Sequence, residues 1–414
     1  MGLLDWLTKK PAADAAAATE ALAGGVRVRT SHGGPGIYEV PREVIAQGGR
    51  AVLNFLLEDD HLEEVMHNGS NEPILVFHHE YGMCRVNYSL DHVSCQVFIH
   101  EIVRAHNARL DEEHPLFDGS LADGSRVNIA IPPVTRSGPS ITVRKFRKRA
   151  ITVPELVRSG SLSADAAAFL WLTIEGMGAK AANMLVVGGT GSGKTTLLNA
   201  LSWFIPSRDR VVIIEDTQEL VVPQPNVVRM LTADGTTMDR LLVNSLRMRP
   251  DRIIVGEVRG PEARTLFGAM NTGHDGCMGT LHANSARESL HRAMNAPMSV
   301  PLSQLVGLDL VIVTELRKTG DGAQRQVVEI AEVSGIGEDT ARINQLFVRD
   351  HAANVLENTG IPSRLRSEIC RAAGVRSEDF AGMLKKRARA IERIAAQRGD
   401  LDTAFLRLLV DPPN

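Results

Sequence analysis

A glycine-rich segment with one lysine and two threonines carries the clearest chemical signal in the sequence. Residues 188–195 read GGTGSGKT, which matches the pattern G-x-x-x-x-G-K-[ST]. Glycines let the backbone curve so that successive N–H groups point inward and form an anion site where a helix begins. The segment therefore predicts a loop that binds the phosphates of a nucleoside triphosphate together with magnesium.

Two residues of this loop are expected to do more than line the phosphate site. Lys194 supplies a mobile positive charge for the outer phosphates and is expected to support catalysis, and the hydroxyl of Thr195 is expected to bind Mg²⁺. The residues predicted to contact ATP here are Gly188, Gly189, Thr190, Gly191, Ser192, Gly193, Lys194, Thr195 and Thr196.

Hydrolysis also requires an acidic side chain that orients a water molecule in line with the terminal phosphate, and two segments offer one. VVIIEDTQEL ends an apolar run at Glu215 and Asp216, and RPDRIIVGEVRG ends another at Glu257. The second departs from the common pattern, because Gly256 stands where an aspartate usually follows the apolar run. Carboxylates at either place could instead cap helices, and this alternative stays open.

Alternating strands and helices are expected to position these residues between about residues 183 and 335. The predicted strands cover residues 184–187, 211–214, 252–255, 278–281 and 308–313. Continuous β-branched runs separated by helices indicate a parallel sheet that is covered on both faces. Because parallel strands end at the same edge of a sheet, the acidic residues and the glycine loop are expected to meet there.

The fold class predicted for the chain is α/β, with a smaller α+β domain before the parallel sheet and a helical region after it. The expected boundaries are a flexible segment at 1–39, the α+β domain at 40–150, a linker and first helix at 151–180, the α/β domain at 181–349 and the helical region at 350–414. In the α+β domain, residues 43–57 and 94–110 are predicted helices, and residues 74–78 and 83–88 a hairpin. Ser161 or Ser163 is expected to cap the first helix of the linker region.

A basic strand pattern, SITVRKFRKR at residues 140–149, closes the α+β domain. A solvated edge strand would explain its charges, but its position before the glycine loop also suits a role facing phosphate. Its basic residues are Arg144, Lys145, Arg147, Lys148 and Arg149.

Composition favours a soluble cytoplasmic protein. Of the 414 residues, 43% are hydrophobic and 23% charged, and the formal net charge is -3, which argues against a generally basic surface for nucleic acid. The four cysteines lie far apart, which suggests neither a disulfide framework nor a zinc ribbon. The start of the chain lacks the pattern of a secretory signal, and no apolar run has the length of a membrane helix.

Four motifs in this order resemble the secretion ATPase superfamily, which drives type II and type IV secretion, type IV and tight-adherence pili and the archaeal flagellum. They are GGTGSGKTT, IIEDTQEL, LRMRPDRIIVGEVRG and TGHDGCMGTLHANS, and the resemblance extends over roughly residues 115–335. In that family they are called the Walker A motif, the Asp box, the atypical Walker B motif and the His box. The resemblance implies a RecA-like domain in a hexameric ring.

The resemblance also implies roles for single residues. Glu257 would be the Walker B glutamate that activates water, and Glu215 would be the Asp-box acid that helps to hold Mg²⁺, so both join Thr195 as expected metal-site residues. His274 and His282 would lie near the terminal phosphate or at the subunit boundary, and Arg144 would reach the phosphates from the preceding domain. The candidates for arginines acting on a neighbouring subunit are Arg240, Arg247, Arg249 and Arg259.

Two features are similar to the tight-adherence and archaeal pilus or flagellar branch of this superfamily. The sequence has no tetracysteine module after the His box, and it contains the segment VVEIAEVSGI at residues 327–336. The resemblance implies a motor that hinges near residues 150–160, acts on an integral membrane platform protein and associates peripherally with the membrane. The main alternative is a RecA-like nucleic-acid translocase, although only 4% of the residues are aromatic. A scaffold that binds ATP without turnover is a third alternative.

Overall fold

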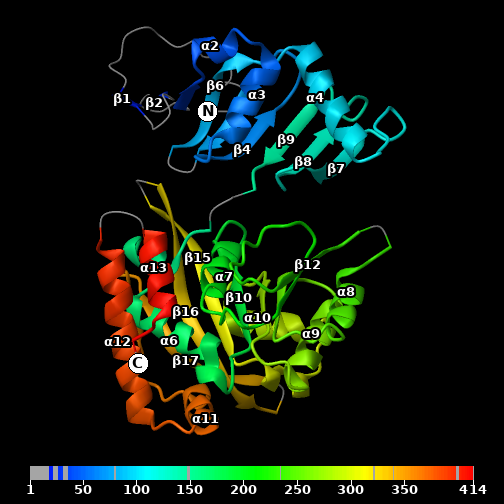
Figure 1. Cartoon of the computed structure of the whole chain (residues 1–414). Coiled ribbons are helices and arrows are strands. Elements are labelled where there is room, and N and C mark those ends of the chain that lie inside the picture. Colours follow the sequence, from blue (N-terminus) through cyan, green and yellow to red (C-terminus); the bar gives the residue numbers. More distant parts are fainter. Residues whose placement is uncertain are drawn as a thin grey trace. The chain divides into compact units, whose positions relative to one another are not determined.

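The computed structural model divides the chain into two compact units, Met1–Arg147 and Lys148–Asn414 (Figure 1). It describes residues 18–21, 27–30, 36–78, 81–146, 150–233, 235–319, 322–338, 340–397 and 401–413. Most of the expected flexible segment and the basic residues Arg147, Lys148 and Arg149 therefore lie outside the described residues. No helix in the described part of the chain combines the length and the apolar character that a membrane crossing requires.

The first unit is built on a nine-stranded sheet in the order β1-β2-β3-β6-β5-β4-β9-β8-β7. Its strands are β1 (Ala18–Ala21), β2 (Arg27–Thr30), β3 (Gly36–Glu39), β4 (Leu62–His67), β5 (Pro73–His78), β6 (Gly82–Ser89), β7 (Leu116–Ser120), β8 (Arg126–Ala130) and β9 (Ser140–Arg144). Residues alternate between buried and partly exposed along β5, as expected for a sheet with one covered face. Helices α3 (Gly49–Glu58) and α4 (His92–Ala105) share a hydrophobic core with these strands.

The predicted hairpin of the first unit is confirmed, because β5 and β6 pair antiparallel. The helix predicted at residues 43–57 is instead two helices, α2 (Arg42–Ile45) and α3, separated at Gly48. Gly48 has φ 94°, which continues no right-handed helix and which glycine adopts without steric cost. The helix predicted at residues 94–110 ends earlier, at Ala105.

The second unit contains a nine-stranded sheet in the order β12-β11-β13-β14-β10-β15-β16-β17-β18. Its strands are β10 (Met184–Gly188), β11 (Val211–Glu215), β12 (Val227–Leu231), β13 (Arg252–Val258), β14 (Met278–Leu281), β15 (Leu310–Thr319), β16 (Gly322–Ile336), β17 (Ala341–Asp350) and β18 (Val355–Asn358). The strands from β12 to β15 pair in parallel, and those from β15 to β18 pair antiparallel. The predicted RecA-like parallel sheet is confirmed, and the antiparallel extension is an addition to it.

Helices cover both faces of this sheet, so that alternate residues of one strand enter two different cores. Met184 and Val186 belong to the core under α6 and α7, whereas Leu185 and Val187 belong to the core under α9 and α10. The helices of the second unit are α5 (Val153–Arg158), α6 (Ala164–Glu175), α7 (Lys194–Ser202), α8 (Met238–Ser245), α9 (Glu262–Asn271), α10 (Ala286–Met294), α11 (Arg364–Ala373), α12 (Ser377–Ala395) and α13 (Leu401–Val410), with the 3₁₀ turns η1 (Gly176–Gly178) and η2 (Leu302–Gly307).

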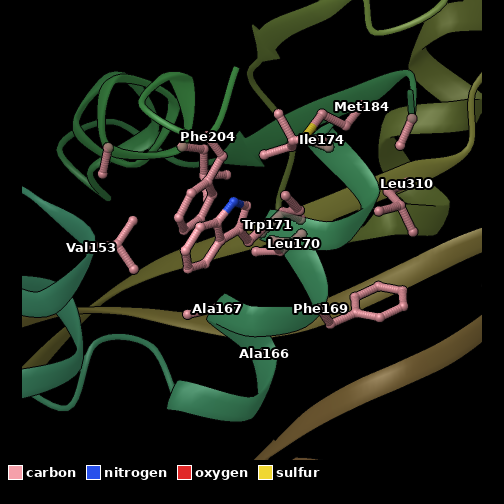
Figure 2. Packing of buried hydrophobic residues seen from close by; sticks show 14 of the residues in the cluster. Val153, Ala166, Ala167, Phe169, Leu170, Trp171, Ile174, Met184, Phe204 and Leu310 are labelled. Carbon is pink, nitrogen blue, oxygen red and sulfur yellow. The ribbon is translucent and has the colours of Figure 1, made fainter. Parts of the chain in front are cut away.

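Helix α6 is the buried centre of the first of these cores. Ser163, one of the two predicted caps, accepts a hydrogen bond from the N–H of Ala166 at its start. Figure 2 shows the ring of Trp171 facing that of Phe204, and the two ring centroids are 5.2 Å apart. The expected hinge segment at residues 150–160 contains α5, which packs on α12 and begins with a capping box at Thr152.

The helical region expected from residue 350 starts later than predicted. Residues 355–358 form β18, which extends the sheet beside β17, and the helices begin at Arg364. The tail is then fixed to the core by Arg387 of α12, which is buried, lies over the ring of Trp171 and forms an ion pair with Glu175. The helical tail is therefore part of the packed second unit.

Candidate active site

The glycine loop connects the end of β10 to the start of α7, as the sequence predicts, and its glycines are required by its geometry. Gly191 and Gly193 have φ values of 72° and 94°, in the region that other residues rarely adopt. A Cβ added to Gly188 would lie 2.4 Å from the hydroxyl oxygens of both Ser192 and Thr314. The Ser192 hydroxyl also donates to the carbonyl of Gly189 at 2.8 Å. These contacts hold the loop in a closed curve at the helix N-terminus.

Lys194 lies against this loop. Its Nζ donates to the carbonyls of Gly188 at 3.0 Å and Gly189 at 3.1 Å. Burial lowers the pKa of Lys194, while the nearby carboxylates of Glu257 and Glu219 act in the opposite direction. The first turn of α7, which contains Thr195 and Thr196, has no acidic residue, so its N-terminal N–H groups favour an anion.

Glu257 lies near the C-terminal end of β13, two strands from β10 in the sheet order. The residue before Glu257 is Gly256, and the neighbouring strand β11 explains why it is a glycine. A Cβ at Gly256 would lie 3.0 Å from Cγ and 3.4 Å from Cβ of Glu215, so the side chain of Glu215 fills the space that an aspartate at 256 would need. The hydroxyl of Thr280 fixes the same glycine by donating to its carbonyl at 2.6 Å.

Glu215 is buried at the end of β11, and its carboxylate is engaged by the chain that follows it. Its Oε1 accepts hydrogen bonds from the N–H groups of Glu219 at 2.9 Å and Leu220 at 3.0 Å. Burial raises the pKa of Glu215 to about 7, although these two hydrogen bonds favour its charged form. Glu215 therefore holds the loop of residues 216–220 in place.

Glu219 is an acidic residue of the site that the sequence analysis missed. Burial lowers the pKa of Lys194, and the negative charge of Glu219 opposes this shift, as the charge of Glu257 does. Helix α7 fixes the backbone around Glu219, because Asn199 of this helix donates to the carbonyl of Glu219 at 3.2 Å and accepts from the N–H of Val221 at 2.7 Å. The signal available in the sequence was the second glutamate of IIEDTQEL, four residues after the first.

The two histidines of the predicted site lie at different edges of the sheet. His282 directly follows β14, at the carboxyl edge where the glycine loop also lies, and its carbonyl accepts from Arg292 at 2.8 Å. His274 precedes β14 and therefore lies at the amino edge, where Cys277 donates its Sγ to the carbonyl of His274 at 3.1 Å. The structure of this chain therefore does not bring His274 to the glycine loop.

The predicted arginines are also distributed. Arg144 is exposed at the end of β9 and belongs to the first unit, whereas the glycine loop belongs to the second. Arg259 forms an ion pair with Asp216, the residue that follows Glu215. Arg240 donates to the carbonyl of Gly235 at 2.6 Å. Arg247 and Arg249 are both exposed, in the turn that follows α8.

Comparisons with known proteins show which proteins the chain is similar to. A protein of Methanocaldococcus jannaschii, MJ0781, is 49% identical over 240 residues, which are 56% of this chain and 33% of that protein. A second protein of that organism, MJ0900, is 31% identical over 375 residues, 87% of this chain and 66% of that protein, so the chain spans a third to two thirds of these two relatives. The conjugal transfer protein TrbB of Rhizobium radiobacter is 34% identical over 275 residues, 65% of this chain and 81% of TrbB.

Among solved structures, the VirB11 ATPase of the Brucella suis type IV secretion system matches with 26% identity and a TM-score of 0.36, over 67% of this chain and 91% of that chain. The family described as type II/IV secretion system protein matches residues 46–359, which span most of both units. Because this match covers more than half of the chain, the chain belongs to the type II/IV secretion system protein family.

Proposed function

We propose that the chain hydrolyses ATP with Mg²⁺ and converts the turnover into mechanical work for a type IV-like pilus or a secretion system. The observation that carries the proposal is a glycine loop whose curvature is fixed by packing and whose carbonyls accept hydrogen bonds from Lys194 at 3.0 and 3.1 Å, at the sheet edge where Glu257 lies near the end of β13. An anion site, a mobile cation and acidic side chains at one sheet edge are the parts that phosphoryl transfer to water needs.

Each side chain receives a role from its surroundings. Lys194 binds the outer phosphates, and its present hydrogen bonds to the loop carbonyls keep it poised there. Glu257 accepts a proton from the attacking water, which is a general-base step. We assign the second acidic role to Glu219 and a positioning role to Glu215, because the Oε1 of Glu215 already accepts two backbone hydrogen bonds.

The oxygen atoms of the site suit magnesium. Mg²⁺ prefers hydroxyl, carboxylate and phosphate oxygens, and the Thr195 hydroxyl with the carboxylates of Glu257 and Glu219 offers such a set. Bound there, Mg²⁺ would neutralise the charge that develops on the phosphates. The buried Glu215 would support this set through its loop.

The assembly and its partners follow from the family and are proposals for this chain. We infer a homo-hexamer in which closure around ATP moves the two units, and an integral membrane platform protein that receives this motion at the cytoplasmic face of the membrane. His274, Arg144 and the four arginines named above are then candidates for contacts beyond their own unit or protomer. The similarity to the conjugal transfer protein TrbB supports a role in a transfer or secretion system.

Two substitutions test the chemistry. Lys194→Ala should abolish both tight ATP binding and phosphate release without unfolding the chain, whereas Glu257→Gln should bind ATP and release no phosphate. Full phosphate release by Lys194→Ala would refute the site. Stimulation of phosphate release by single-stranded DNA or RNA, and not by vesicles with anionic lipid, would instead support a nucleic-acid translocase.

A further inference from the structure

The outer side of the glycine loop rests on the β15–β16 hairpin, and one side chain of this hairpin has no role in the function proposed above. Arg325 of β16 donates its Nε to the carbonyl of Gly191 at 3.0 Å. Its aliphatic part continues over Gly193, where an added Cβ would lie 3.3 Å from the Cδ of Arg325. Leu316 pairs with Arg325 across the two strands and also approaches Gly191, at 3.8 Å from an added Cβ.

Residues 191–193 of the loop need contacts with other segments to hold their conformation, because glycine restricts its own backbone very little. Gly191 and Gly193 both have positive φ, and glycine samples many other conformations at little cost. Ser192 is fixed by hydrogen bonds to the Gly189 carbonyl and to the Thr314 hydroxyl. Arg325 adds a hydrogen bond to the carbonyl of Gly191, so it limits how the peptide between Gly191 and Ser192 can turn.

The other side of Arg325 is attached to the turn that follows α5. Its carbonyl accepts from the hydroxyl of Ser161 at 2.7 Å, and the N–H of Val327 donates to the Ser161 carbonyl at 2.9 Å. Arg349 is buried and donates to the carbonyls of both Gly160 and Ser161 at 3.0 Å. The turn at residues 159–161 is thus held firmly against the strand that carries Arg325.

We propose that Arg325 is a positioning residue for the nucleotide: it holds the Gly191 carbonyl so that the loop amides face the phosphates, and it links the loop to the turn at residues 159–161. This inference rests on the proposed function. Helix α5 is the first helix after the boundary between the two units, so the link connects the phosphate site to the start of the second unit. A change of the loop on nucleotide binding would then reach Ser161 through a single residue.

The first test compares nucleotide affinity and turnover in the full-length chain. Arg325→Ala should weaken ATP and ADP by the same factor, roughly three- to tenfold, because one hydrogen bond to a charged donor is lost. The kcat should stay within about twofold, and Arg325→Lys should recover part of the affinity because its ammonium can still donate to the carbonyl. Arg317→Ala is the matched control, since Arg317 lies in the same hairpin but donates to the carbonyl of His351.

Several results would overturn this role. A loss of affinity for ATP alone would mean that Arg325 contacts the terminal phosphate directly. An equal loss of affinity in Arg317→Ala would mean that the positive charge of the hairpin, and not the contact with Gly191, supports nucleotide binding. Unchanged affinity in Arg325→Ala would remove the role altogether while leaving the proposed ATPase intact. A wild-type chain that binds neither nucleotide would instead overturn the proposed function, and the inference with it.

The link to the turn is tested by a double-mutant cycle with Ser161→Ala. In the wild-type background this substitution should weaken ATP binding about two- to threefold, because it removes the hydrogen bond to the Arg325 carbonyl. In the Arg325→Ala background it should have almost no effect, since interacting residues give non-additive changes. Equal effects in the two backgrounds would contradict the link, and circular dichroism with thermal unfolding would show that every variant folds.

Discussion

Replacing Glu215 and Glu219 separately by glutamine distinguishes a positioning acid from an acid of the reaction. The two residues lie in one short motif, but they are used differently. The Oε1 of Glu215 accepts two backbone hydrogen bonds in a buried site, whereas the carboxylate of Glu219 acts on Lys194. Glutamine keeps an oxygen acceptor and removes the negative charge. It therefore preserves the backbone hydrogen bonds that Glu215 accepts and removes the charge that Glu219 contributes to the site.

The magnitudes follow from these contacts. Because burial raises the pKa of Glu215 to about 7, a neutral form is already accessible there at neutral pH, and Glu215→Gln should change the free energy of unfolding by less than about 1 kcal/mol. Glu215→Ala leaves the N–H groups of Glu219 and Leu220 without this acceptor and should cost about 2–4 kcal/mol. Glu219→Gln should fold normally and slow phosphate release by roughly 100-fold.

Phosphate release over a series of Mg²⁺ concentrations, with urea unfolding in parallel, measures both effects. Glu215→Gln should retain most of the wild-type turnover, and Glu219→Gln should also require more Mg²⁺ for half-maximal activity. The reverse pattern, an inactive Glu215→Gln with an active Glu219→Gln, would refute this assignment and return the metal-binding role to Glu215.

Three further predictions concern packing and pH. Gly188→Ala should weaken the affinity for ATP more than about tenfold in equilibrium titration, because its Cβ would lie 2.4 Å from the hydroxyl oxygens of Ser192 and Thr314 and force the loop open. Arg387→Met should lower the free energy of unfolding of the second unit by about 2 kcal/mol in urea, since it loses the contact with Trp171 and the ion pair of the buried Arg387 with the partly exposed Glu175; an unchanged midpoint would contradict this anchor. His67 is buried, neither of its ring nitrogens has a hydrogen-bond partner among the described residues, and burial lowers its pKa against the opposing charge of Glu72. The unfolded state therefore binds more protons, so the free energy of unfolding of the first unit, measured with urea, should decrease as the pH falls below about 6.5, and His67→Leu should reduce this decrease; a decrease of the same size in the variant would exclude His67 as its cause.

The parts of the fold that were predictable are those with a local signal. The glycine loop follows a continuous apolar run, and β10, β11, β13, β14 and β15 all coincide with predicted strands. Strand β12 was missed because it lies at the edge of the sheet, is only partly buried and contains Arg229. The antiparallel strands β16 and β17 were not predicted as an extension of the sheet.

The site was predictable where it depends on position along a strand, and not where it depends on contacts between distant segments. Glu257 and the loop could be placed at one edge because parallel strands end together. The same rule separates His274 from His282, since one precedes β14 and the other follows it. The burial of Glu215 and the contact of Arg325 with Gly191, 134 residues away in sequence, depend on packing that composition and spacing do not encode.

The most direct measurement is an experimental structure of the chain with Mg²⁺ and a non-hydrolysable ATP analogue. We expect the phosphates to lie on the backbone N–H groups of residues 189–195, with Lys194 turned from the loop carbonyls to the outer phosphates. The carboxylates of Glu257 and Glu219 should face the terminal phosphate and the metal. Phosphates bound elsewhere, or a Glu257 side chain directed away from the terminal phosphate, would contradict the proposed ATPase.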